Sequence, residues 1–192
     1  MSMEESPMKD KTVRRIGTAL MIFIPILFSC GSNPPMPTQQ AEAFFTLGTQ
    51  RLQRGENDEA IVDYNKALEI SPRYAEAYLN RGIAYRRKGQ YDQAISDYGA
   101  VLLIDPKEAR AYCNRGNAYL EKGEYDKAIS DYNKALEVGS KDPEVLFNRG
   151  VAFYSKKEYD KSWADIKKAQ GLGYRIPPDF LDDLRKASGR QD

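Results

Sequence analysis

The chain has 192 residues, of which 41% are hydrophobic and 30% charged, a composition that supports an apolar core and argues against wholesale disorder. Basic and acidic residues nearly balance at 29 against 28, so no bulk charge attracts nucleic acid or an anionic membrane. Histidine is absent and only two cysteines occur, Cys30 and Cys113. The commonest proton shuttle and any zinc or disulfide framework are therefore missing, and we expect no enzyme activity, no metal and no cofactor.

The first 29 residues have the order of a secretory signal. Four basic residues precede an apolar run over residues 16–28, and Ser29 then places a small residue before Cys30. A helix of the length of this run spans about 20 Å, which is less than the ~30 Å hydrocarbon core of a bilayer. We predict a signal peptide and not a transmembrane anchor.

The Leu-Phe-Ser-Cys sequence that ends at Cys30 resembles the processing site of bacterial lipoproteins. That resemblance implies that Cys30 becomes the first mature residue and carries diacylglycerol and a further acyl chain such as palmitate. The alternative is an ordinary cleaved signal followed by an incidental cysteine. Because Gly31 is not the aspartate that holds enteric lipoproteins at the inner membrane, the resemblance implies the outer membrane, facing the periplasm. Residues 30–40, with three prolines, predict an extended linker.

After residue 40 the chain repeats every 34 residues, over residues 41–74, 75–108, 109–142 and 143–176. Small residues mark three places in each unit: Gly48, Gly82, Gly116 and Gly150; Ala60, Ala94, Ala128 and Ser162; and Ala67, Val101, Ala135 and Ala169. Two apolar stripes of helical spacing, separated by a turn, predict two antiparallel helices per unit. The fourth unit is degenerate, since Lys157 stands where the second has Gly89.

A period of 34 with small residues at these offsets resembles the tetratricopeptide repeat (TPR) family. The resemblance implies an all-α, right-handed α-solenoid of about four TPR helix pairs. We expect the small residues where two helices cross closely. A further helix within residues 177–192, with an apolar stripe through Phe180, Leu181 and Leu184, is expected to cap the stack.

Polar residues recur at fixed places as well. Arginines recur at Arg81, Arg115 and Arg149, and aspartates at Asp63, Asp97, Asp131 and Asp165. We expect these arginines and aspartates to form structural ion pairs across the stack, and not a row of ligand-binding arginines. Before these arginines stand Asn80, Asn114 and Asn148. In some TPR proteins such an asparagine ladder holds the backbone of a bound peptide, so the resemblance makes peptide binding one interpretation. The other is a consensus residue without function.

The resemblance also implies that the first helices line a concave groove. The candidate groove residues, besides the three asparagines, are Ile83, Asn117, Phe147, Val151 and Tyr154. This surface is more apolar than charged and suits an amphipathic helix or extended segment of a partner, with Ile83, Phe147 and Tyr154 as anchors. The alternatives are burial of these side chains within the stack or coverage by the protein's own N-terminal linker.

The groove lacks the residues with which chaperone-binding TPR domains hold a terminal carboxylate. Phe45, Thr49, Leu79 and Ile83 occupy places where such a clamp needs polar or basic groups, so we do not expect chaperone-tail binding. We interpret Cys113 as a partly buried small apolar residue and not as a reactive thiol.

These features together predict a membrane-anchored scaffold of the bacterial cell envelope that binds a partner protein or peptide, with the lipid on Cys30 as its membrane attachment. The alternative is a self-associating assembly factor for secretion, pili or outer-membrane proteins, which forms a homo-oligomer and holds no peptide. A fold of this kind does not identify the partner.

Overall fold

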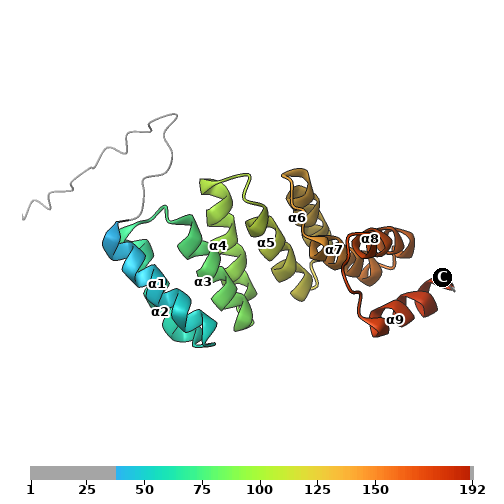
Figure 1. Ribbon diagram of the computed structural model, residues 1–192, viewed down its shortest axis with the longest axis horizontal. Coiled ribbons are helices and arrows are strands. Elements are labelled where there is room, and N and C mark those ends of the chain that lie inside the picture. The colour runs from blue at the N-terminus through green and yellow to red at the C-terminus, as the bar shows by residue number, and fades with distance from the viewer. Residues whose placement is uncertain (1–37, 191–192) are drawn as a thin grey trace, which may run out of the picture. The chain divides into compact units, whose positions relative to one another are not determined.

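The computed structural model describes residues 38–190, and within this range the chain is all-α, with nine helices (Figure 1). The helices are α1 (Gln39–Gln53), α2 (Asn57–Ile70), α3 (Ala75–Arg87), α4 (Tyr91–Ile104), α5 (Ala109–Glu121), α6 (Tyr125–Glu137), α7 (Pro143–Ser155), α8 (Tyr159–Gly171) and α9 (Pro178–Ser188). The prediction of an all-α solenoid of helix pairs with a C-terminal helix is confirmed. The predicted signal peptide, the lipidation site Cys30 and most of the linker lie outside the described residues. None of the helices described has both the length and the apolar character needed to span a bilayer.

The first helix begins two residues before the predicted start of the first unit at Ala41. Thr38 is its N-cap, and the Thr38 hydroxyl accepts a hydrogen bond from the backbone N–H of Ala41 at 3.3 Å. A capping hydroxyl satisfies one of the orphan donors of the first turn, which extends the helix into the segment assigned to the linker.

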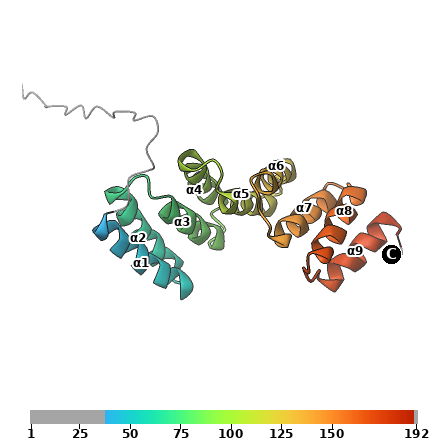
Figure 2. The same ribbon diagram turned by 45° about the horizontal axis from the view of Figure 1, so that its top comes forward.

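Each unit packs its two helices against each other and its second helix against the first helix of the next unit. Consecutive first helices also contact directly, α1 with α3, α3 with α5 and α5 with α7. The second helices contact the first helices on either side of them (Figure 2). The first helices therefore form the inner face of the stack, on which side chains of three successive units meet.

The recurring glycines lie where the second helix of the same unit comes closest. A Cβ on Gly82 would lie 2.6 Å from Cε1 of Tyr98, and one on Gly116 would lie 2.7 Å from Cε1 of Tyr132. Contacts this short are sterically forbidden, so an aromatic ring takes the volume that a side chain at the glycine would need. The alanines of the second helices, Ala60, Ala94 and Ala128, are fully buried at the same crossings.

Arginine–aspartate pairs link the two helices of a unit, as predicted. The Arg81 guanidinium donates from Nε and Nη2 to the two carboxylate oxygens of Asp97, at 2.8 and 2.6 Å. Arg115 with Asp131 and Arg149 with Asp165 repeat this two-point geometry. The first unit has leucine at the arginine's place, and there Arg51, one turn later, reaches Asp63 at 2.8 Å.

One turn departs from the repeat at a residue that strains the backbone. Gly55, Gly89 and Gly123 follow the first helices of units 1 to 3 with positive φ, and the equivalent residue in unit 4 is Lys157, with φ of 62°. A side chain in this left-handed region clashes with the following carbonyl, at about 1–2 kcal/mol.

The C-terminal helix continues the pattern of the stack. Arg190 pairs with Asp160 at 2.7 Å, over the same sequence interval of 30 residues that joins Lys122 to Asp92 in the interior. Leu184 of α9 is fully buried, and the indole N–H of Trp163 in α8 donates to the Ser188 hydroxyl at 3.0 Å. The helix thus covers α8 as the start of a further unit would, which keeps the apolar face of α8 from water.

Candidate functional site

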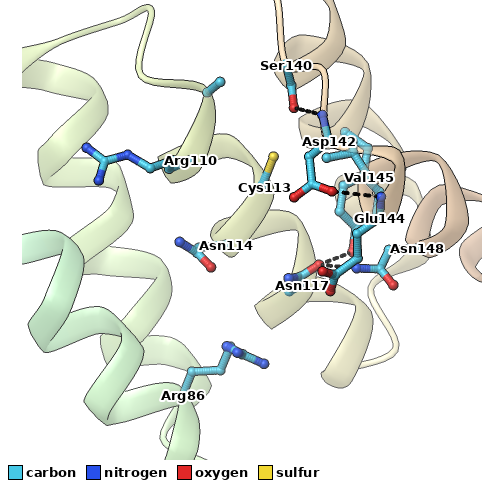
Figure 3. A pocket seen from close by; sticks show the side chains of 12 residues that line it. Arg86, Arg110, Cys113, Asn114, Asn117, Ser140, Asp142, Glu144, Val145 and Asn148 are labelled. Carbon is cyan, nitrogen blue, oxygen red and sulfur yellow. Dashed lines mark hydrogen bonds between the residues drawn. The ribbon is translucent and has the colours of Figure 1, made fainter. Parts of the chain in front are cut away.

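The inner face of the stack is hollowed by a pocket of about 290 Å³ where α3, α5 and the start of α7 meet (Figure 3). Its walls include the side chains of Arg86, Arg110, Cys113, Asn114, Asp142 and Glu144. Three successive units contribute to it, so the site depends on the stacking and not on any single helix pair. Of the predicted groove residues, the pocket brings together Asn114, Asn117 and Asn148.

The three asparagines of the ladder are not equivalent. The Asn80 amide donates to the Thr49 hydroxyl of the preceding unit at 3.4 Å, and the Asn148 amide donates to the Asn117 carbonyl oxygen at 3.1 Å. The corresponding neighbour of Asn114 is Ile83, which offers no acceptor, and in the described part of the chain the Asn114 side chain makes no hydrogen bond. Its amide can therefore donate to and accept from a bound molecule without breaking an existing bond.

The ninth residue of each 34-residue unit, which is Thr49, Ile83 or Asn117 in the first three units, lies next to a core tyrosine. The hydroxyl of Tyr64 donates to Thr49 at 3.3 Å, and that of Tyr132 donates to the Asn117 carbonyl oxygen at 2.7 Å. The equivalent Tyr98 has Ile83 at that place, and its buried hydroxyl lies near the Arg86 guanidinium but forms no hydrogen bond of normal geometry with the described residues. Burial raises the pKa of Tyr98, and the positive charge of Arg86 together with weak hydrogen bonding to it opposes that rise. Asn117 is thus partly a structural residue.

The predicted aromatic anchors contact the protein's own C-terminal segment. The Phe147 ring stacks on Tyr174 with centroids 5.1 Å apart and meets the edge of Phe180 at 5.5 Å, and Tyr154 lies 5.4 Å from the same Phe180 ring. Burial within the stack and coverage by the N-terminal linker were the alternatives to partner binding for these residues. The structure shows that the C-terminal segment lies on them.

Ile83 is partly buried among the cores of the first two units, and Val151 is partly buried on α7. Neither residue lines the pocket at Asn114. The centre of the candidate site therefore moves from the apolar anchors to the polar pocket.

The charges in and around the pocket are unequally paired. Arg86 donates to Glu121 at 2.7 Å, while Arg110 is held at 2.6 Å by Glu76 and at 2.9 Å by Glu108. Hydrogen bonds from Arg110 lower the pKa of Glu108, so this carboxylate stays charged well below neutral pH. The two cations of the pocket are thus already neutralised by carboxylates of the protein.

A family model for the TPR repeat matches the sequence three times, at residues 48–89, 83–123 and 116–157. These matches span more than half of the chain, and each runs from within a first helix to the end of the first helix of the next unit. The chain belongs to the tetratricopeptide repeat family. Comparison with curated proteins gives no match.

Solved TPR structures share this fold. The first TPR domain of Spaghetti (RPAP3), bound to the HSP90 peptide SRMEEVD, is 26% identical with a TM-score of 0.59, over 61% of this chain and 93% of that one. The crystal structure of MamA is 26% identical with a TM-score of 0.67, over 69% of this chain and 78% of MamA. The Arabidopsis OM64 TPR domain is 25% identical with a TM-score of 0.57, over 58% of this chain and 93% of that domain. The TPR fold is a protein-interaction scaffold.

The Cys113 thiol lies in the wall of this TPR pocket but is poorly suited to act as a nucleophile. Burial raises the pKa of Cys113 to about 11, against which hydrogen bonding to Ser140 has a smaller effect. The reactive species is the thiolate, and at neutral pH it is scarce here.

Sequence reasoning missed Asp142 and Glu144, and it did not single out Arg86 and Arg110 as candidate site residues. Asp142 had a local signal, because it precedes Pro143 and caps α7 by accepting from the Glu144 N–H at 2.9 Å. Arg86 stands where the other TPR units have Leu52, Leu120 and Tyr154. A charged residue at a place that is otherwise leucine or tyrosine indicates a role that packing alone does not explain.

Proposed function

We propose that this TPR protein is an adaptor that binds an extended segment of a partner protein on its inner face, centred on Asn114. The observation that carries the proposal is the pocket of about 290 Å³ around an asparagine amide that makes no hydrogen bond within the described chain. An amide side chain pairs with a peptide group through one donor and one acceptor, which favours extended backbone as the ligand. RPAP3, whose TPR domain is 93% covered by this chain, is bound to a peptide in its structure, which supports the same general role.

The proposal includes attachment to a bacterial membrane through lipid on Cys30, with the outer membrane as the location. It is supported by the order of basic residues, apolar run and cysteine at the N-terminus. Three acyl chains at ~0.8 kcal/mol per buried CH₂ would hold the protein at the membrane permanently. A matched test is available, because the chain has one other cysteine. Cells grown with a clickable palmitate analogue should label the wild type and Cys113→Ser but not Cys30→Ser, whereas label on Cys30→Ser would refute lipidation.

The binding role is tested by cross-linking in cells, with a photoreactive amino acid in place of Arg110 at the pocket wall. We expect cross-links to a linear segment of another protein, which mass spectrometry of the adduct identifies. Substitution Asn114→Ala should reduce the adduct several-fold, while Gln93→Ala, which removes an exposed amide from α4, should leave it unchanged. Adducts formed only with a second copy of the chain would favour the self-associating assembly factor instead.

A further inference from the structure

We propose that the pocket at Asn114 selects a basic segment, one that places lysine or arginine side chains beside Asp142 and Glu144. This inference rests on the proposed function and adds the chemical class of the segment. In Figure 3, Arg86 and Arg110 lie on one side of the pocket and Asp142 and Glu144 on the other.

The cationic groups of the pocket cannot attract an acidic ligand strongly. Arg86 and Arg110 both end on carboxylates of the protein, and Arg110 is shared between Glu76 and Glu108. Together these residues bring two positive charges against three negative ones. An acidic peptide would have to compete with formed ion pairs and would meet net negative charge behind them.

The opposite wall carries acidic groups that remain available. Asp142 and Glu144 are both exposed, and neither forms an ion pair with another described residue. Asp142 uses one oxygen to cap α7, where the positive end of the helix dipole offsets part of its charge. Glu144 also lies in the first turn of α7 but caps no backbone N–H, and it lines a second hollow beside the first, together with Arg86 and Glu121. The pocket and its ion-pair partners thus present five carboxylates against two guanidinium groups.

The floor of the pocket defines how such a segment would lie. Asn114 holds one peptide group through its amide, and in extended backbone alternate side chains point the same way, about 7 Å apart. Asp142, the N-cap of α7, and Glu144, in its first turn, both line the pocket and lie on the same side of it in Figure 3. A segment with basic residues at alternate positions would direct those side chains toward this wall.

The test measures fluorescence anisotropy of three labelled extended peptides with the full chain. One alternates lysine with alanine, one has serine for each lysine, and one has glutamate for each lysine. We expect the lysine peptide to bind about tenfold more tightly than the serine peptide at low salt, with most of this preference lost at 0.5 M salt. Asp142→Asn and Glu144→Gln should each weaken lysine-peptide binding by up to about fivefold, the upper range for an exposed ion pair. Glu69→Gln and Asp183→Asn, which change exposed carboxylates outside the pocket, should leave it unchanged.

The outcomes separate this inference from the proposed function. If all three peptides bind equally, or the glutamate peptide binds best, and Asn114→Ala weakens each of them, the groove binds peptide but the charge selection is wrong. If no peptide binding depends on Asn114, both proposals fail. An equal loss for the pocket variants and the two control variants would show that the lysine peptide responds only to overall charge, which also overturns the inference.

Discussion

The three core tyrosines offer a matched test of how the inner face and the core share hydrogen bonds. Tyr64, Tyr98 and Tyr132 occupy equivalent places and are each fully buried, but only the hydroxyl of Tyr98 forms no hydrogen bond of normal geometry with the described residues. Replacing each with phenylalanine removes one oxygen atom and leaves the ring that packs on the glycine. The three substitutions therefore differ mainly in the hydrogen bond that is lost.

The expected magnitudes follow from these partners. Tyr132→Phe loses the 2.7 Å bond to Asn117, a net contribution of about 0.5–1.5 kcal/mol to the free energy of unfolding. The Asn117 oxygen still accepts from Asn148, so no buried acceptor is orphaned. Tyr98→Phe removes an unpaired buried hydroxyl, whose burial costs about 1–3 kcal/mol, and should leave stability unchanged or raise it by about 0.5–1 kcal/mol. The two variants should thus differ by about 1.5 kcal/mol.

Urea unfolding followed by circular dichroism measures this difference, with the slope m checked for each variant because short repeat arrays can unfold in more than one step. Ile83→Asn supplies Tyr98 with the acceptor that Asn117 supplies to Tyr132. It should be less destabilising in the wild type than in the Tyr98→Phe background. Equal losses for Tyr98→Phe and Tyr132→Phe, or no coupling between Ile83→Asn and Tyr98→Phe, would show that the hydroxyl of Tyr98 is satisfied and the reasoning wrong.

Three further predictions concern single sites. Lys157→Gly should raise the free energy of unfolding by about 0.5–1 kcal/mol in thermal or urea unfolding, because glycine relieves the left-handed strain at this turn; an unchanged or lower value would contradict it. Gly116→Ala should lower the free energy of unfolding by about 1–3 kcal/mol, because the new methyl group would clash with Tyr132. Gly99→Ala, whose methyl group would meet only an Arg115 nitrogen at 3.9 Å, should instead gain up to about 1 kcal/mol from helix propensity. Similar melting temperatures for the two variants would refute the close crossing at Gly116. Cys113 in the native chain should react with iodoacetamide about 100-fold more slowly than in the unfolded chain at pH 8, as its pKa rises from 9.0 to about 11. Because the native state holds this proton more tightly than the unfolded state, the protonated thiol contributes fully to the free energy of unfolding below pH 9. That contribution is lost between pH 9 and about 11, which unfolding measured as a function of pH would show.

The sequence predicted those features of the fold that depend on contacts within a single repeat unit. The glycine and alanine places, the paired helices and the Arg81–Asp97 type of ion pair all follow from residues that recur every 34 positions. Contacts between units were harder to predict. Asn80, Asn114 and Asn148 look identical along the chain, and only the residue that faces each of them from the preceding unit, such as Thr49 or Ile83, makes Asn114 different. The burial of Phe147 required knowing that Phe180 returns over α7, which depends on the path of the turn before α9 and not on the repeat.

This division of roles decides which substitutions report on binding. Asn117 both lines the pocket and accepts hydrogen bonds from Tyr132 and Asn148, so its loss would disturb the core and the groove together. Asn80 and Asn148 likewise hold neighbouring units in register, and reduced binding after their replacement would not separate recognition from folding. Asn114 has no bond within the described chain to lose. If Asn114→Ala keeps the wild-type free energy of unfolding but no longer binds the peptide, recognition is assigned to this side chain. If Asn114→Ala instead loses as much stability as Asn148→Ala, all three asparagines are structural residues of the stack.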